Sequence, residues 1–391
     1  MSSVQSSPLQ SSDGATTVQA SALTRDSGQS GWGKRLLLTL VILAFAVALA
    51  WFVALRQSLL FLVGLGMGGV LAGVRFGFTT GWRNFIERRD PSGILAQVLL
   101  LALAALICIP MLAAHPNELQ AALGPPSISL LVGAFLFGAC MQLADGCGSG
   151  TLYKAGLGIP LNTVILPLFA IGSFLGSATL ERWLSLGAVP PYGLVDHFGA
   201  TESLGITLAG LAVLALVILW RADPALPRFS RKLMIGAILL AILAALNLAI
   251  AGQPWGVVYG FGLWAAKLAT AAGLFDPSGN AFWSEAVNTT TLHQSVFLDI
   301  TSITNIGILA GALWIAAGKR RSPSKPMTGK QWTVAIIAGL LLGYSSRLAF
   351  GCNIGAMVSG VSTGSLHGWI WIAMAFMGSI LGLRIRRHFG F

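Results

Sequence analysis

The chain has 391 residues, of which 55% are hydrophobic and only 9% are charged. Soluble domains carry about 25% charged residues, so this composition, with a mean hydropathy of +0.78, excludes an ordinary soluble protein. The net charge of +11 does not indicate nucleic-acid binding, because the basic residues lie in short loops between apolar segments. The expected environment is a lipid bilayer, and no nucleic-acid partner is expected.

Long apolar segments follow one another along the chain, each close to the ~20 residues that a membrane-spanning helix requires. The uncharged ones are Leu36–Leu55, Ser92–Ala114, Ile128–Ala144, Ile159–Leu180, Leu204–Trp220, Leu233–Gly252, Ile300–Gly318, Trp332–Ser346 and Leu366–Leu383. Glycine-rich Leu59–Val74 and Pro254–Gly273, which contains Lys267, are further candidates. Because backbone groups in lipid must be bonded within the segment, each is predicted to be a helix. The expected fold is an all-α polytopic membrane protein with roughly 9–11 transmembrane helices plus short re-entrant half-helices.

The first 33 residues differ from the rest of the chain. They are rich in Ser, Gln and Thr, which is typical of a disordered tail over residues 1–33. Residues 34–391 are then predicted to form a single transmembrane domain. A signal peptide would have a shorter apolar core than Leu36–Leu55. We therefore expect an uncleaved first helix that starts in the cytoplasm.

Clusters of basic residues lie between the apolar segments, in the positive-inside pattern of a bacterial inner membrane. They are Arg83, Arg88 and Arg89; Arg221, Arg228, Arg231 and Lys232; Lys319, Arg320, Arg321, Lys325 and Lys330; and Arg384, Arg386 and Arg387. Both ends of the chain are basic, whereas crossings by every candidate segment would put the two ends on opposite sides. At least one segment is therefore expected to be re-entrant or half-length, and Pro254–Gly273 is the one we suspect.

Two glycine–cysteine motifs lie about half the chain apart. They are LADGCGSGTLYKAG, Leu143–Gly156, and RLAFGCNIGAMVSG, Arg347–Gly360. When they are aligned, Leu143-Ala144 matches Leu348-Ala349, Gly146-Cys147 matches Gly351-Cys352, and Gly150 matches Gly355. This repeat predicts two homologous halves, roughly residues 59–186 and 254–391. The basic loops predict opposite orientations for the two halves, as in transporters built from inverted repeats.

Each motif predicts a broken helix that carries a thiol. Glycine permits a sharp break, the amides of a helix start attract anions, and a thiol adds a soft, weakly donating group. Two such breaks that face each other would form a small site for a sulfur-bearing anion. The candidate pathway residues are Cys147, Cys352, Cys140, Gln142, Gly146, Gly148, Arg347, Gly351 and Asn353. One alternative is that the cysteines are only buried and structural. A zinc site is a weaker alternative, because no Cys-x-x-Cys or Cys/His pair lies nearby.

Other ionisable and thiol groups invite simpler interpretations. Asp145 and Arg347 are candidates for an ion pair, although Arg347 is equally able to offer its charge to an anion. Asp299 is positioned to cap a helix. Cys108 has no glycine context and is expected to serve packing, and Lys154 is expected near the cytoplasmic surface.

MQLADGCGSGTLYKAG and RLAFGCNIGAMVSGVSTGSLHGWIW together resemble the paired signatures of the YeeE/YedE family of bacterial inner-membrane proteins. The resemblance implies an α-helical fold with short helices meeting near its centre, and uptake of thiosulfate or a related sulfur compound. It implies that Cys147 and Cys352 contact the sulfur end of the anion. It also implies a TusA-like sulfur-carrier protein as the cytoplasmic partner. Family members often carry a further cysteine in an earlier segment, where this chain has RFGFTTGWR with Thr79 near that place.

The expected function is therefore transport and not enzymatic catalysis, with no cofactor and no metal. No nucleotide-binding motif is present, so direct use of ATP is not expected. Three alternatives remain open at this point: a selenium-compound transporter, an intramembrane sulfurtransferase that forms a persulfide, and a scaffold whose motifs only pack helices. The sulfurtransferase needs an activated thiolate, which Asp145 close to Cys147 disfavours.

Overall fold

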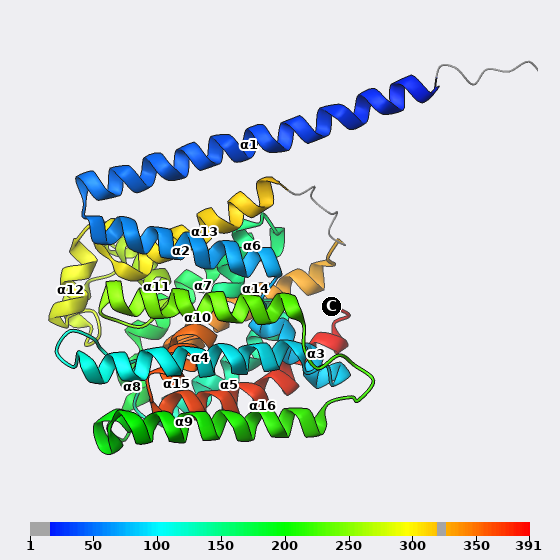
Figure 1. Ribbon diagram of the computed structural model, residues 1–391. Coiled ribbons are helices and arrows are strands. Elements are labelled where there is room, and N and C mark those ends of the chain that lie inside the picture. Colours follow the sequence, from blue (N-terminus) through cyan, green and yellow to red (C-terminus); the bar gives the residue numbers. More distant parts are fainter. Residues whose placement is uncertain (1–15, 319–325) are drawn as a thin grey trace, which may run out of the picture.

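The computed structural model describes residues 16–318 and 326–391, and over these ranges the chain is helical and contains no β-strand (Figure 1). The α-helices are α1 (Thr16–Phe52), α2 (Leu55–Val74), α3 (Phe78–Arg88), α4 (Ser92–Ala114), α5 (Ile128–Leu143), α6 (Gly148–Gly156), α7 (Pro160–Ala178), α8 (Leu180–Leu184), α9 (Leu194–Arg221), α10 (Arg231–Ala251), α11 (Val258–Ala271), α12 (Ala286–His293), α13 (Ile300–Ala317), α14 (Gly329–Leu348), α15 (Gly360–Ser362) and α16 (Leu366–His388). Two 3₁₀ turns, η1 (Pro277–Gly279) and η2 (Val296–Leu298), and a π-helical segment, η3 (Asn353–Ser359), complete the set. The all-α prediction is confirmed.

Ten helical stretches of the described chain are long and apolar enough to cross a membrane, within the predicted range. The suspected segment Pro254–Gly273 contains α11, which has only 14 residues and is not among the ten. It is shorter than the ~20 residues that a span requires. Ten crossings return the chain to the side on which it started, as two basic ends require.

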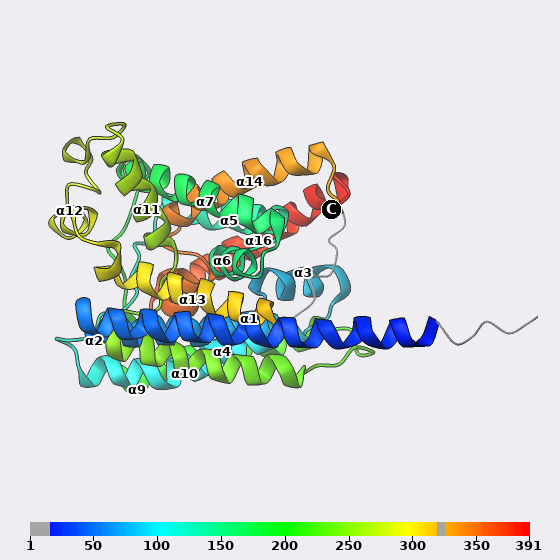
Figure 2. The same cartoon turned by 90° about the horizontal axis from the view of Figure 1, so that it is seen from above.

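The first candidate span, Trp32–Phe52, is the apolar part of α1. This helix lies along the outside of the bundle, against α2 and α13 (Figures 1 and 2). Trp51 and Phe52 are largely exposed at its end, as expected for side chains that face lipid. Of the tail predicted over residues 1–33, the first fifteen lie outside the described residues, and helix is described from Thr16 onward.

The basic segments gather at one end of the bundle. Helix α3, the α9–α10 connection, the end of α13 and the end of α16 all lie there, at the right in Figures 1 and 2. Helices α11 and α12 lie at the other end. We call these the basic end and the opposite end. Such an asymmetry of arginine and lysine is typical of the cytoplasmic side of a membrane protein.

The two helices that precede the cysteine motifs run in opposite directions. Helix α5 begins beside the segment that follows α8 and ends at the basic end, where the carbonyl of Gln142 accepts a hydrogen bond from Arg386 of α16 (2.7 Å). Helix α14 begins at the basic end, where Gln331 bonds to the last residues of the chain, and ends beside α8. There Tyr344 accepts a hydrogen bond from Trp183 (2.8 Å). The motifs that follow therefore lie at the ends of antiparallel helices.

Glycines allow the central helices to approach closely. Helix α5 packs on α16, and α7 packs on α14. A Cβ atom at Gly138, Gly378, Gly172 or Gly343 would collide with a backbone carbonyl of the facing helix. Small residues at helix–helix contacts serve this purpose in membranes, where association depends on close packing and not on the hydrophobic effect. The close contacts fix the positions from which both cysteine motifs leave their helices.

Candidate functional site

The two cysteine motifs have nearly the same backbone conformation. After α5 ends, Asp145 adopts a left-handed conformation with φ 51°; after α14 ends, Phe350 does so with φ 56°. An aromatic residue in this region is unusual and points to a constraint set by the surrounding fold. Cys147 then has φ −84° and ψ −168°, and Cys352 has φ −97° and ψ −167°. The sequence repeat is therefore also a repeat of local structure.

The hydrogen bonds around the two breaks repeat as well. The amide of Gly146 donates to the carbonyl of Met141 (3.1 Å), and the amide of Gly351 donates to that of Ser346 (2.9 Å). These bonds close the last turn of α5 and of α14 and turn the chain back toward the cysteine. No other residue suits Gly351 readily, because its φ of 151° lies in a region that side chains rarely adopt.

Each thiol caps the short helix that follows it. The amide of Gly150 donates to the sulfur of Cys147 (3.4 Å), which also lies 3.5 Å from the hydroxyl of Ser149. The amide of Ile354 donates to the sulfur of Cys352 (3.4 Å). Serine and threonine usually fill this capping position. A cysteine in the same role holds a polarizable sulfur at the start of the helix, and both cysteines are fully buried.

The two breaks meet inside the protein. Helix α6 packs against η3, and a Cβ added to Gly148 would lie 2.9 Å from the sulfur of Cys352. Asn353, next to Cys352, is fully buried, and neither its amide nitrogen nor its amide oxygen has a protein partner. Buried polar groups are normally hydrogen-bonded. The unpartnered amide next to Cys352 makes the junction of the two motifs the candidate site.

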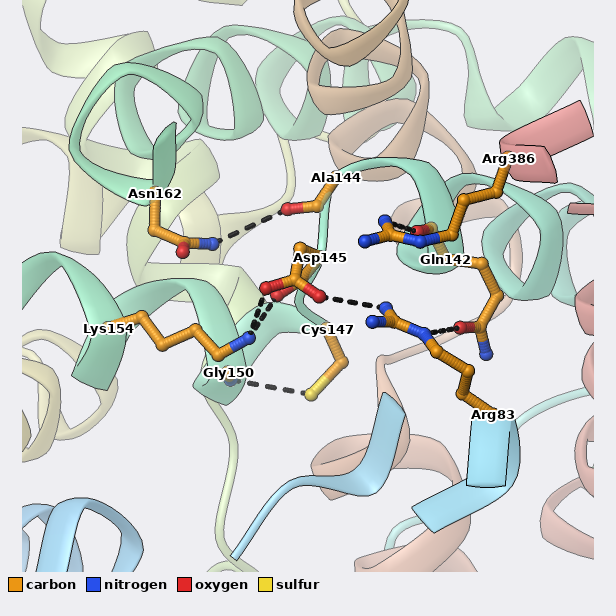
Figure 3. Close-up of polar contacts among 9 residues, drawn as sticks. All are labelled: Arg83, Gln142, Ala144, Asp145, Cys147, Gly150, Lys154, Asn162 and Arg386. Atoms are coloured by element: carbon orange, nitrogen blue, oxygen red, sulfur yellow. Dashed lines mark hydrogen bonds and ion pairs between the residues drawn. The ribbon is translucent and has the colours of Figure 1, made fainter. Parts of the chain in front are cut away.

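Figure 3 shows a network of charged side chains at the basic end of this site. Asp145 accepts from Arg83 of α3 (2.8 Å) and from Lys154 of α6 (2.8 Å). Lys154 also donates to the backbone carbonyl of Asp145. The side-chain oxygen of Gln142 accepts a hydrogen bond from Arg83 (3.2 Å), and the backbone carbonyl of Gln142 accepts one from Arg386. Two cations thus pair with one carboxylate and a third, Arg386, lies beside them, so the network carries a net positive charge.

The candidate ion pair between Asp145 and Arg347 is wrong. Because α5 and α14 are antiparallel, the residues at their C-terminal ends lie on opposite sides of the site. The guanidinium of Arg347 instead donates to the hydroxyl of Ser177 (2.8 Å) and lies over the rings of Phe282 (4.9 Å) and Tyr259 (5.6 Å). Arg347 forms no ion pair with any residue in the described ranges. It is a half-buried cation, without an ion-pair partner in the described ranges, on the side of the site that faces the opposite end.

The structure brings most of the predicted site residues together, but in two groups. Cys147, Gly148, Cys352 and Asn353 lie where the motifs meet, and Gly146 packs beneath Thr151 and Asn162 in the first break. Gln142 belongs to the charged network at the basic end. Cys140 is buried in the last turn of α5, where its carbonyl accepts from Ala144 (2.9 Å).

The residues for which the sequence suggested simpler roles are Cys108, Asp299 and Lys154, and the structure places them, together with Thr79, as follows. Cys108 lies in an apolar cluster with Leu112, Ala245 and Leu248. Asp299 caps α13 by accepting from the amide of Ser302 (2.7 Å), which confirms the predicted cap. Lys154 is not simply a surface residue, because its side chain is 12% exposed and is paired with Asp145. Thr79 is buried in α3, and its hydroxyl has no protein partner.

Sequence reasoning missed Arg83 and Arg386 as parts of the site. Both were interpreted only as markers of the cytoplasmic side. The available signal was their position one or two turns from a helix end, where a long side chain can reach back toward the bundle interior. The carboxylate or carbonyl that each arginine reaches depends on how α3, α5 and α16 pack. No short stretch of the sequence contains that information.

Comparison with known proteins identifies the family. Residues 73–381 match the model of a family described as sulphur transport. The thiosulfate transporter TsuA of Spirochaeta thermophila is 28% identical over 342 residues, which cover 81% of this chain and 95% of that protein. The thiosulfate transporter TsuA of Escherichia coli is 21% identical over 335 residues, covering 80% of this chain and 89% of the relative. The probable transporter YedE of Escherichia coli is 30% identical over 143 residues, 37% of this chain and 35% of that protein. Because the family match spans most of its length, the chain belongs to the sulphur transport (YeeE/YedE) family, as its paired cysteine motifs predicted.

Proposed function

We propose that this protein carries thiosulfate across the membrane, through a passage whose narrowest part lies between Cys147 and Cys352. The observation that carries the proposal is the meeting of two cysteine-capped helix starts around a buried, unpartnered Asn353. The similarity to two proteins named thiosulfate transporters, over about four fifths of the chain, supports the choice of substrate.

The arrangement of charges suits a small divalent anion. The start of α6 carries roughly half a positive charge from its free amides. Arg347 lies toward the opposite end of the site, and Arg83, Lys154 and Arg386 lie toward the basic end. An anion that leaves water would thus meet a positive group before and after the thiols. Burying it without such groups would cost many kcal/mol.

The thiols themselves offer recognition without a covalent step. A thiol is a weak donor and sulfur is highly polarizable. The terminal sulfur of thiosulfate carries much of the negative charge and is a soft acceptor, so an S–H···S contact favours it over the oxygen-only surface of sulfate. Asn353 can donate to a sulfonate oxygen of the same anion. The cycle needs no bond to the protein, so the chain acts as a transporter and not as an enzyme.

We further propose that the two motifs belong to inverted, homologous halves, roughly residues 59–186 and 254–391. Three observations support this: the equal backbone conformations about 205 residues apart, the opposite directions of α5 and α14, and the exchange of partners in the pairs α5–α16 and α7–α14. Two halves of this kind place equivalent thiols on the two sides of one central site. Thiosulfate would then pass from one cysteine to the other across a local twofold axis that lies in the membrane plane.

The proposed membrane is the bacterial inner membrane, with the basic end in the cytoplasm. Uptake of an anion against the membrane potential costs about 2.3 kcal/mol per charge for each 100 mV. Removal of thiosulfate on the cytoplasmic side would offset this cost. A TusA-like sulfur-carrier protein is our proposed cytoplasmic acceptor, and the exposed arginines at the basic end would attract an acidic partner.

The experiment that tests the proposal is uptake of sulfur-labelled thiosulfate by cells that lack other sulfate and thiosulfate permeases. The unmutated chain should support uptake, and Cys147→Ser and Cys352→Ser should each abolish it at matched membrane abundance. Cys108→Ser is the control, because Cys108 is a buried thiol outside both motifs in sequence and lies in an apolar cluster with Leu112, Ala245 and Leu248. Uptake that survives in the Cys147→Ser/Cys352→Ser double variant would contradict the proposed role of the thiols.

A further inference from the structure

An apolar cavity of about 650 Å³ lies between α3, α4, α9 and α16, with Met357 of η3 also in its wall. This volume falls within the roughly 300–1,000 Å³ that small-molecule sites occupy. Its walls are formed mainly by aromatic and branched aliphatic side chains, among them Phe85, Val98, Leu214, Ile218, Trp369 and Phe376. Ala373, also in the wall, is exposed, so the cavity opens at the surface of the helix bundle.

The polar groups in the wall satisfy one another. The indole nitrogen of Trp82 donates to the side-chain oxygen of Gln97 (2.8 Å), and the amide nitrogen of Gln97 donates to the carbonyl of Phe78 (3.3 Å). Trp82 and Gln97 therefore leave few polar groups free for a solute inside the cavity. The interior suits a hydrocarbon chain, because transfer of such a chain into an apolar pocket requires no hydrogen bonds to be replaced.

Two arginines lie at the mouth of the cavity, where α3 and α9 end. Arg89 follows the last residue of α3, and Arg221 is the last residue of α9. The two helix ends are joined by a hydrogen bond from the amide of Asp223 to the carbonyl of Arg89 (3.1 Å). Arg221 also lies over the ring of the exposed Trp220 (4.6 Å). A tryptophan beside an arginine is typical of the level at which lipid headgroups lie.

The carboxylates near this mouth are engaged elsewhere. Asp90 accepts from the amide of Ser92 at the start of α4 (2.9 Å), and Asp223 accepts from the amide of Ala225 (2.9 Å). Glu87 pairs with Arg387 (3.1 Å). Within residues 16–318 and 326–391, neither Arg89 nor Arg221 has an ion-pair partner. The mouth therefore presents two arginines that are free of direct ion pairs in the described ranges, beside an apolar cavity.

We propose that this cavity binds an anionic phospholipid of the cytoplasmic leaflet, with an acyl chain between α9 and α16 and the phosphate at Arg89 and Arg221. Basic pockets between transmembrane helices on the cytoplasmic side select anionic headgroups, and arginine binds phosphate in a bidentate manner. The lipid would also contact segments that lead to the candidate site. Trp82 in the wall precedes Arg83 of the charged network, and Met357 in the wall belongs to η3, which starts at Cys352.

The test measures which lipid stays bound to the purified full-length chain. The protein is extracted in a mild detergent, mixed with equal amounts of phosphatidylglycerol and phosphatidylcholine of matched chain length, passed through gel filtration, and examined by native mass spectrometry. The unmutated chain should retain phosphatidylglycerol over phosphatidylcholine by about tenfold or more, as two arginines near a headgroup imply. The Arg89→Gln/Arg221→Gln variant should bind the two lipids about equally.

The Arg88→Gln/Arg228→Gln variant is the matched control, because it removes the same charge at the same end and neither residue lines the cavity. It should keep the preference of the unmutated chain. A second variant, Ala373→Phe, fills part of the cavity and leaves both arginines in place; it should also lose the bound phosphatidylglycerol. The proposal is overturned if the unmutated chain shows no preference, if the control pair loses it equally, or if Ala373→Phe retains the lipid.

Discussion

Replacement of Gly148 by alanine tests whether the contact between the two motifs forms the passage. The added Cβ would lie 2.9 Å from the sulfur and 3.3 Å from the Cβ of Cys352, and 3.6 Å from a methyl group of Val258. The first distance is too short, so Cys352 must move or α6 must shift. Overpacking of this kind costs about 1–3 kcal/mol, whereas alanine in place of glycine within a helix gains roughly 0.5–1 kcal/mol. The net loss of stability is therefore about 0–2.5 kcal/mol, and the variant should still fold and insert.

Thiosulfate uptake by Gly148→Ala should nevertheless fall strongly, because the methyl group lies where the two thiols face each other. The assay compares initial uptake rates and thermal unfolding midpoints of the unmutated and variant proteins at equal membrane abundance. The control is Gly73→Ala, because a Cβ at Gly73 would have no heavy atom within 4 Å. Normal uptake by Gly148→Ala with an unchanged unfolding midpoint would refute the idea that this contact lies in the passage.

The same contact predicts a coupling between two substitutions. In a Cys352→Ala background the sulfur that Gly148→Ala would strike is absent, so most of the loss of stability should disappear. Contacting residues typically couple by about 0.5–3 kcal/mol in such cycles. The double variant should still show no thiosulfate uptake, because it lacks the thiol of Cys352. Equal effects of Gly148→Ala in both backgrounds would show that the strain lies elsewhere.

Three further predictions concern the charges. Asp145→Asn keeps the left-handed backbone, which asparagine tolerates, but leaves Arg83 and Lys154 without their carboxylate. Because these groups are partly exposed, we expect the free energy of unfolding to fall by roughly 1–3 kcal/mol. Thermal unfolding measures this loss, and an unchanged midpoint would contradict it. Arg347→Gln should reduce uptake more than Arg347→Lys, since only lysine keeps a positive charge on that side of the site, and equal uptake by the two variants would argue against a role for the charge. Asp299→Ala removes the cap of α13 and should cost about 0.5–2 kcal/mol while uptake persists; loss of uptake at full stability would place Asp299 in the passage.

The sequence allowed the breaks to be located, because their signals are local. The spacing of Gly146, Cys147 and Gly150, repeated at Gly351, Cys352 and Gly355, is short-range information about where a helix ends and another begins. The predicted segment Ile128–Ala144 ends within one residue of α5, which ends at Leu143. Long uncharged runs likewise predicted the candidate spans, since lipid acts on each segment separately.

The partners of the charged groups could not be predicted in the same way. Asp145 and Arg347 occupy nearby positions in the aligned repeats, which suggested a pair, but the antiparallel course of α5 and α14 places them on opposite sides of the site. Arg83 reaches Asp145 only because α3 folds back beside the end of α5. Such contacts depend on how helices distant in sequence pack, and many packings satisfy the same apolar pattern.

The central claim, that this chain by itself moves thiosulfate across a membrane, is tested most directly in vesicles that contain the purified protein and no other. Sulfur-labelled thiosulfate is added outside, and the label retained inside is followed with time. We expect label to enter, excess unlabelled thiosulfate to block its entry, and equal sulfate to leave it largely unchanged, because sulfate has no terminal sulfur for Cys147 and Cys352 to contact. Entry no faster than into protein-free vesicles, or equal competition by sulfate, would contradict the account.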